Sequence, residues 1–180
     1  MGRSPEEAVV VRQQQRWIRS GLAAALLLVA PQTSFAQTGA CSLVQTDQPS
    51  GAQILRCGDD LTLRAAANTR YQLIDGTNLR LDSGALLIEF HPSQRRRNFQ
   101  ILTPQAIASV RGTTWAMELK PGRTATLVID GSVTVKGDSD QGTVDLGPGQ
   151  GVDVLLGTGP LQVKRWPEPR AAALLARFGR

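Results

Sequence analysis

Turn signals recur about every ten residues along most of the chain. Each one combines glycine with aspartate, proline, serine or threonine, the residues that tight turns favour. The signals are Gly58-Asp59, Asp75-Gly76, Ser83-Gly84, Pro121-Gly122, Asp130-Gly131, Gly137-Asp138, Gly147-Pro148-Gly149 and Gly157-Thr158-Gly159. Short runs between them alternate apolar and polar residues, as in Leu61–Leu63, Leu79–Leu81 and Val133–Val135. Many short strands at even spacing predict an all-β sandwich, barrel or solenoid.

The last residues of the chain follow a different pattern. Pro167 and Pro169 end the extended structure, and Pro169 is tolerated in the first turn of a helix. Apolar residues then recur at helical spacing, at Ala171, Leu174, Leu175 and Phe178. We expect residues 167–180 to form a C-terminal helix that caps the open end of the β domain, because uncovered strand edges are costly. A helix that docks a partner is the alternative.

The N-terminal residues have the pattern of a secretory leader. Arg12, Arg16 and Arg19 precede the apolar run Leu22–Ala30, and Ser34-Phe35-Ala36 provides small residues where a signal peptidase reads. The apolar run is nine residues long, whereas a membrane span needs roughly 20. We therefore expect residues 1–36 to be a cleaved signal peptide and the mature chain, without a transmembrane helix, to be periplasmic. A membrane anchor is the alternative.

The chain has two cysteines, Cys41 and Cys57, and both follow the expected cleavage site. In an oxidising compartment an isolated pair most simply forms one structural disulfide. Closing a loop of about 16 residues is expected to stabilise the fold by roughly 3 kcal/mol. A redox pair or a zinc site has no support, because the spacing is not Cys-x-x-Cys and two thiols make a poor zinc site.

A set of spaced motifs lies between Thr103 and Gln150. They are Thr103-Pro104, Ala108, Val110-Arg111-Gly112-Thr113, Trp115, Leu127, Gly131-Ser132-Val133, Val144-Asp145-Leu146 and Pro148-Gly149-Gln150. Together these motifs resemble the FecR domain, the periplasmic module of ferric-citrate-type sensors and sigma-factor regulators. The resemblance implies a twisted β-helix-like or solenoid-like stack of short strands. We expect this fold over residues 37–166, with a β-sandwich as the fallback.

The resemblance also implies a function. FecR domains are non-enzymatic signalling modules that lie outside the inner membrane and receive a signal from a protein partner, often the periplasmic domain of a receptor. A full regulator carries a sigma-factor-binding segment and a transmembrane helix before this domain, and neither pattern is seen here. We therefore expect a stand-alone secreted form that acts as a periplasmic adaptor or as a soluble subunit of a membrane sensor.

Arg111 and Gly112 form the centre of the main motif. An arginine between apolar strands is costly unless a carboxylate or carbonyl pairs with it. Glu118 and Asp130 are the candidate partners for an internal tie that fixes the bend, and recognition of an acidic partner is the alternative. Gly112 allows a tight bend, and Trp115 is expected to pack in the core. Thr113 and Gly131 complete the set of motif residues.

Arg95, Arg96 and Arg97 form the strongest local charge cluster and are candidate partner-binding residues. They lie in the turn between Leu86–Phe90 and Phe99–Leu102. The cluster is either a solvated turn or a contact for an acidic protein face or anionic glycolipid. Nucleic acid is not expected, because no aromatic residues interleave with the cluster. The expected mature chain also carries a net charge of only +3, since the leader holds four arginines and two glutamates.

Patterns that carry chemistry are scarce. His91 is the single histidine, which leaves no histidine metal site and no Ser-His-Asp set. Most aspartates lie in turn signals, where they bond to their own backbone. We therefore expect no catalytic, cofactor-binding or metal-binding residues. The alternative to a signalling module is a structural β module that binds glycan or peptidoglycan, which would need exposed aromatic side chains.

Overall fold

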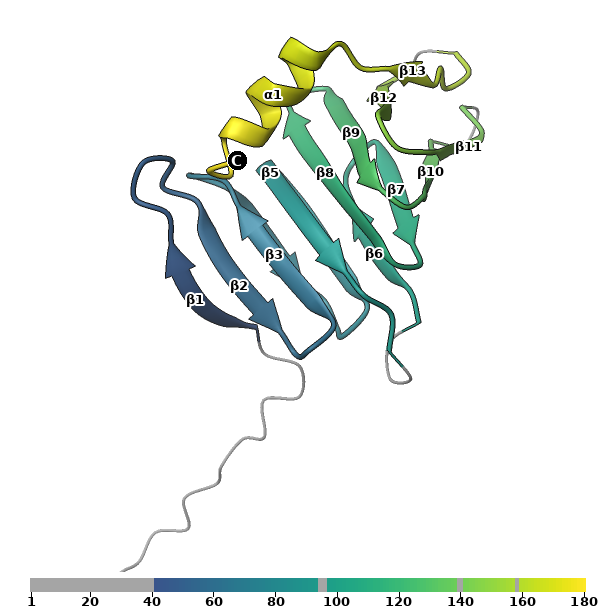
Figure 1. Ribbon diagram of the computed structural model, residues 1–180. Helices are drawn as coiled ribbons and strands as arrows, with labels where there is room; N and C mark the ends of the chain where they lie inside the picture. The colour runs from purple at the N-terminus through teal and green to yellow at the C-terminus, as the bar shows by residue number, and fades with distance from the viewer. Residues whose placement is uncertain (1–40, 94–96, 139–140, 158) are drawn as a thin grey trace, which may run out of the picture. The chain divides into compact units, whose positions relative to one another are not determined.

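The computed structural model describes residues 41–93, 97–138, 141–157 and 159–180, which form one compact unit. The expected signal peptide lies outside the described residues. The described chain is mostly β, a curled half-barrel of many short strands with one C-terminal helix (Figure 1). The predicted fold class is therefore confirmed. Within these residues, no helix reaches the length and apolarity needed to cross a bilayer.

The described elements are, in chain order, β1 (Ser42–Thr46), β2 (Gln53–Cys57), β3 (Leu61–Ala65), β4 (Arg70–Leu73), β5 (Asn78–Phe90), β6 (Phe99–Leu102), β7 (Ala106–Val110), β8 (Thr113–Lys120), β9 (Arg123–Asp130), β10 (Val133–Gly137), β11 (Thr143–Leu146), β12 (Gln150–Leu155), β13 (Lys164–Arg165) and α1 (Glu168–Ala176). They form two layers that share β5. Sheet A has the order β1-β2-β3-β5-β8-β9-β12-β13, and sheet B has the order β4-β5-β6-β7-β10-β11. All of these pairs are antiparallel except β5 with β6.

The long strand β5 joins the two layers. Its first half pairs with β4 and β6 in sheet B, and its second half, from Gly84, pairs with β8 in sheet A. The bend lies at Gly84, whose φ is +95°, and a Cβ there would lie 2.7 Å from the Cα of Thr69. The Thr69 hydroxyl holds the bend by donating to the carbonyl of Ala85 at 3.0 Å and accepting from the Ala85 N–H at 3.1 Å. Gly84 is required there because of both the positive φ and the close backbone.

The main core lies between the two sheets. Alternate residues of the strands point into it, as the period of a β-strand requires. Its largest fully buried side chains include Trp115, Phe90, Phe99, Leu79, Leu81, Leu86, Ile88 and Ile101. Each such side chain stabilises the fold by roughly 1.5–3 kcal/mol relative to an exposed one. The alternation read from the sequence therefore identifies the residues that close the two layers.

A second apolar layer covers the opposite face of sheet A. The sheet contributes mainly small residues, Ala66, Ala85, Ala116 and Ala125, together with Leu87 and Leu127. Helix α1 and its flanking residues contribute Trp166, Leu174 and Phe178. Because small side chains let the helix approach the sheet, β8 and β9 are buried on both faces. The predicted C-terminal helix is confirmed over Glu168–Ala176. It covers the face of sheet A that points away from sheet B and not, as expected, the open end of the β domain (Figure 1).

Ion pairs fix α1 on this face. Arg170 pairs with Asp153 of β12 at 2.5 Å, Arg177 with Glu118 of β8 at 2.5 Å, and Arg180 with Glu89 of β5 at 2.6 Å. The guanidinium of Arg170 also lies 3.6 Å from the ring centre of Trp166. Each arginine of the helix segment therefore reaches a carboxylate on a different strand.

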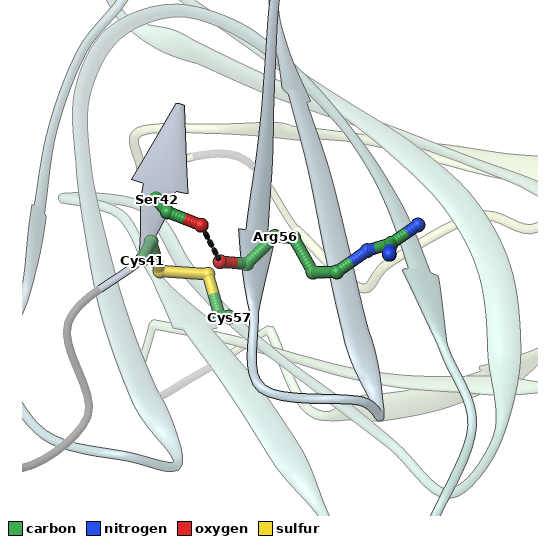
Figure 2. The surroundings of a disulfide bond; sticks show 4 residues. All are labelled: Cys41, Ser42, Arg56 and Cys57. Atoms are coloured by element: carbon green, nitrogen blue, oxygen red, sulfur yellow. Dashed lines mark hydrogen bonds between the residues drawn. A yellow bond between two sulfur atoms is a disulfide. The ribbon is translucent and has the colours of Figure 1, made fainter. Parts of the chain in front are cut away.

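The predicted disulfide is present between Cys41 and Cys57 (Figure 2). It joins the residue before β1 to the last residue of β2, where Ser42 Oγ also donates to the Arg56 carbonyl at 3.4 Å. All five residues of β1 are exposed, and the strand carries a bulge at Val44. The disulfide therefore holds an edge strand that buries little surface of its own.

Candidate functional site

Four connections between the layers meet at one end of the described unit. They run from β5 to β6, β7 to β8, β9 to β10 and β11 to β12, and each passes from one sheet to the other. Strand register places them together. Phe90 pairs with Thr113, Thr114 with Asp130, and Val110 with both Phe99 and Val133. We call this end of the unit the crossover end.

The family motif residues build the corners of the crossover end. Gly131 has φ +83°, and a Cβ there would lie 2.7 Å from the carbonyl oxygen of Gly112. Gly112 has φ +89°, and a Cβ there would lie 2.9 Å from Cδ of Pro92. The Thr113 hydroxyl donates to the Ser132 carbonyl at 2.8 Å and so ties two connections together. The glycines are needed because three connections pack against one another with no room for side chains.

Trp115 lies in the core between the sheets, as expected, and is fully buried. Its Nε1 has no hydrogen-bond partner among the described residues. The ring packs just inside the crossover end, two residues after Thr113. Trp115 therefore belongs to the core and presents no surface to a partner.

Arg111 corrects one expectation from the sequence. It is exposed and makes no hydrogen bond or ion pair with any described residue, so the expected tie to Glu118 or Asp130 is absent. Glu118 faces away from the core on β8 and pairs instead with Lys120, Arg123 and Arg177. The prediction of an internal tie was wrong because strand alternation puts Glu118 on the helix-covered face of sheet A, away from the corner. Gly112 and Thr113 form the bend without the arginine.

Arg97 lies at the same end as Arg111. Phe99 pairs with Val110, so the residues just before β6 and just after β7 are neighbours. Arg97 is exposed, whereas Arg95 and Arg96 lie outside the described residues. We call the pair Arg97 and Arg111 the cationic corner. Arg97 comes from the predicted charge cluster and Arg111 from the family motif, and the described structure places both at the crossover end.

His91 also lies at the crossover end. It is exposed, and its backbone N–H donates to the Asp60 carbonyl at 2.8 Å. The described residues hold no group of three or more His, Cys, Asp or Glu side chains that could bind a metal.

A buried polar cluster lies at the opposite end of the unit. Thr124 Oγ1 is 2.8 Å from Thr103 Oγ1 and 2.8 Å from Gln105 Oε1. The Thr103 hydroxyl also bonds to both backbone groups of Ala106 and closes the turn between β6 and β7. From the sequence, Thr103-Pro104 was recognisable only as part of the family motif. In the structure, Thr103 closes the turn between β6 and β7 and links it to Thr124 of sheet A.

The ion pairs beneath α1 were also missed from the sequence. Arg170 and Arg177 are seven residues apart, a spacing that puts both on one side of a helix. From that spacing, a charged stripe beside the apolar stripe of the helix could have been predicted. Their partners could not be found, because Asp153 and Glu118 lie on strands far away in the sequence.

Comparison with known proteins identifies the family. The family model described as FecR protein matches residues 42–134, a little over half of the chain, and so confirms the resemblance seen in the sequence. No curated protein matches. Two crystal structures of a Parabacteroides distasonis protein, provisionally assigned as an anti-sigma factor, are each 16% identical over 77% of this chain, with a TM-score of 0.48. The match spans 61% of that protein's length. The chain belongs to the FecR protein family, and this membership supports a signalling or regulatory module.

Proposed function

We propose that this protein is a non-enzymatic, periplasmic signalling module that binds a protein partner in the cell envelope through the cationic corner. The observation that carries the proposal is the position of Arg111. The other motif residues, Gly112, Thr113 and Gly131, build a rigid corner, whereas Arg111 contributes nothing to the corner and faces solvent. A motif residue with no internal contact, on a rigid support, is suited to recognition.

The charge of the corner indicates the kind of partner. Arg97 and Arg111 are exposed at the crossover end without an acidic partner among the described residues. Exposed charges of one sign steer an oppositely charged surface and raise its rate of association. The partner is therefore a protein with an acidic face, such as the periplasmic domain of a sensor or receptor.

Two features support the periplasmic location. The leader pattern in residues 1–36 is typical of exported proteins. The disulfide between Cys41 and Cys57 is of the kind that persists in oxidising compartments. Within that compartment the module acts as an adaptor or as a soluble subunit of a membrane sensor.

The glycan-binding alternative is less well supported. The described aromatic side chains of Trp, Tyr and Phe are all buried or half-buried: Tyr71, Phe90, Phe99, Trp115, Trp166 and Phe178. A sugar-binding surface usually stacks its ligand on exposed rings. Retention of the protein on purified peptidoglycan, with no crosslinked protein partner, would favour this alternative.

Site-specific crosslinking in cells tests the proposal. A photoreactive residue is placed at Arg97 or at Lys136, an exposed cation of β10 that serves as the control position. We expect Arg97 to crosslink one envelope protein, identified by mass spectrometry, and Lys136 not to do so. The variant Arg111→Glu should remove the crosslink from Arg97 while leaving the melting temperature unchanged. Equal crosslinking from both positions, or no effect of Arg111→Glu, contradicts the proposal.

A further inference from the structure

A groove of about 360 Å³ opens beside β12, on the edge of sheet A. Its walls come from β12 and from residues 159–164, and Trp166 also lines it. The lining residues include Asp153, Leu155, Pro160, Leu161, Lys164 and Trp166. We call it the β12 groove. All of it lies outside residues 42–134, which the family model matches.

The edge of β12 beside the groove is unpaired over part of its length. Strand β13 pairs only with Gln150 and Gly151. On this edge the Gly149 carbonyl accepts from the Trp166 N–H at 3.0 Å, and the Leu155 carbonyl accepts from Gln141 Nε2 at 2.6 Å. Because backbone groups alternate along a strand, those of Asp153 point to the same edge. No described strand pairs with them there, so they are available to an added strand.

Part of the groove and of its rim is apolar, beside the polar side chains of Asp153, Gln162 and Lys164. Seven large apolar side chains are exposed among the described residues, and three of them, Leu155, Leu156 and Val163, lie in the segment that forms the groove. Leu161 and Trp166 add apolar surface inside it. Such clustering on one edge is typical of an interaction surface, whereas isolated exposed apolar residues are ordinary.

The charge of the groove is positive. Asp153 lies 2.5 Å from Arg170 and 3.8 Å from Arg123, so its negative charge is compensated. Lys164 and Arg165 are exposed and have no acidic partner among the described residues. A ligand that enters the groove therefore meets uncompensated cations at its rim.

We propose that the β12 groove binds a short, extended, acidic segment of a partner protein by strand addition. The segment pairs with the backbone of Asp153, places alternate apolar side chains against Leu161 and Trp166, and directs a carboxylate to Lys164. The edge left open between Gly151 and Leu155 is three residues long, which at about 3.3 Å per residue allows only a short added strand. This mode of recognition draws affinity from the main chain and specificity from the flanking side chains. The groove is separate from the cationic corner, so the inference goes beyond the proposed function and does not require it.

Peptide binding to the purified protein tests the inference. The probe is a synthetic, end-blocked peptide that alternates glutamate and valine. The control peptide has lysine in place of each glutamate. Trp166 lines the groove and Trp115 is fully buried, so intrinsic fluorescence reports occupancy and calorimetry confirms it. We expect the acidic peptide to bind, with affinity falling as salt rises, and the lysine peptide not to bind.

Variants locate the site. Lys164→Glu should weaken binding of the acidic peptide about tenfold or more, since a like charge replaces an opposite charge. Lys136→Glu on β10 should leave the affinity for this peptide unchanged. Both residues are exposed, so both variants should keep the wild-type melting temperature. Equal binding of the two peptides, equal effects of the two variants, or no binding up to about 1 mM, the weak end of specific affinities, overturns the inference. Arg111→Glu should not affect peptide binding, so loss of the cellular crosslink and loss of peptide binding are separate results.

Discussion

The two faces of sheet A are buried in different ways. Toward sheet B the strands present large apolar side chains, among them Trp115, Met117 and Ile88. Toward α1 the same strands present alanines, with Glu118 among them. The inner face is therefore closed by side chains that interdigitate, and the outer face by a helix that lies close to a nearly flat surface.

The difference indicates that the inner layer provides most of the stability of the fold, whereas the outer layer is a peripheral addition. The inner layer is built from strands that, up to Thr134, lie within the matched family residues. The outer layer depends on the C-terminal segment, whose ion pairs are partly exposed, with arginine side chains at 36–43% exposure. Partly exposed pairs contribute little to stability. Apolar contacts of Leu174, Phe178 and Trp166 hold α1 in place, and the arginines set its position.

The largest expected effect comes from the inner layer. Trp115→Ala removes a fully buried ring between the sheets and should lower the free energy of unfolding by about 3–5 kcal/mol. Urea denaturation followed by circular dichroism measures the change. A loss of less than about 1 kcal/mol would show that the inner layer is not the main source of stability.

Phe178→Ala should lower the free energy of unfolding by less, about 2 kcal/mol, although Phe178 is also fully buried. The cost is limited because α1 can detach as a unit while the β layers remain folded. Hydrogen exchange should accelerate at backbone amides of α1 and stay slow in β5 and β8. Deletion of residues 171–180 should lower the melting temperature and the solubility. If this deletion leaves both unchanged, the helix does not cover the sheet in solution.

Glycine corners link the two layers and give an intermediate effect. Gly131→Ala forces a Cβ to within 2.7 Å of the Gly112 carbonyl at positive φ, and we expect a cost of about 1–3 kcal/mol. Gly122→Ala is the matched control, because its φ is +74° but nothing lies within 4 Å of the added Cβ. Thermal melts of both variants should show the larger loss for Gly131→Ala, and equal losses would argue against packing at the corner.

Ion pairs of the outer layer should give a smaller effect. Arg177→Gln removes one of three cations around Glu118 and should cost about 0.5–1 kcal/mol, less at high salt. Melting curves at low and high sodium chloride test both the size and the salt dependence. An effect as large as that of Phe178→Ala would mean that charge, and not apolar contact, holds the helix.

The smallest effect is expected at Asp75, which lies on neither face. Hydrogen bonds from the Thr77 N–H and from the Asn78 side chain lower the pKa of its carboxyl to about 2. A lowered pKa means that the carboxylate favours the fold above pH 4, and this contribution is lost as pH falls through about 2. Titration by NMR should give the pKa of Asp75, and Asp75→Asn should narrow the difference in stability between pH 4 and pH 2. An ordinary pKa near 3.8 contradicts the turn geometry.

Much of the inner layer was predictable from the sequence. Alternation in Leu79–Leu81 and Val133–Val135 marked core positions, and Gly112 and Gly131 lie where the chain turns between sheets. The pairing of Cys41 with Cys57 followed from their being the only two cysteines. The candidate site was predicted only in part. Arg97 and Arg111 lie at the same end of the unit, but the sequence placed Arg111 inside an ion pair that does not form.

The sequence by itself determined the β class, the turns, the disulfide and the terminal helix. Each of these follows from local requirements, such as a period of two, a positive φ or an apolar helical stripe. Only the tertiary structure decided that Arg111 is exposed, that Glu118 faces α1, and that the edge of β12 lies open beside Lys164. Those outcomes depend on which distant strands pair and in what register, and that choice follows from the packing of the whole chain.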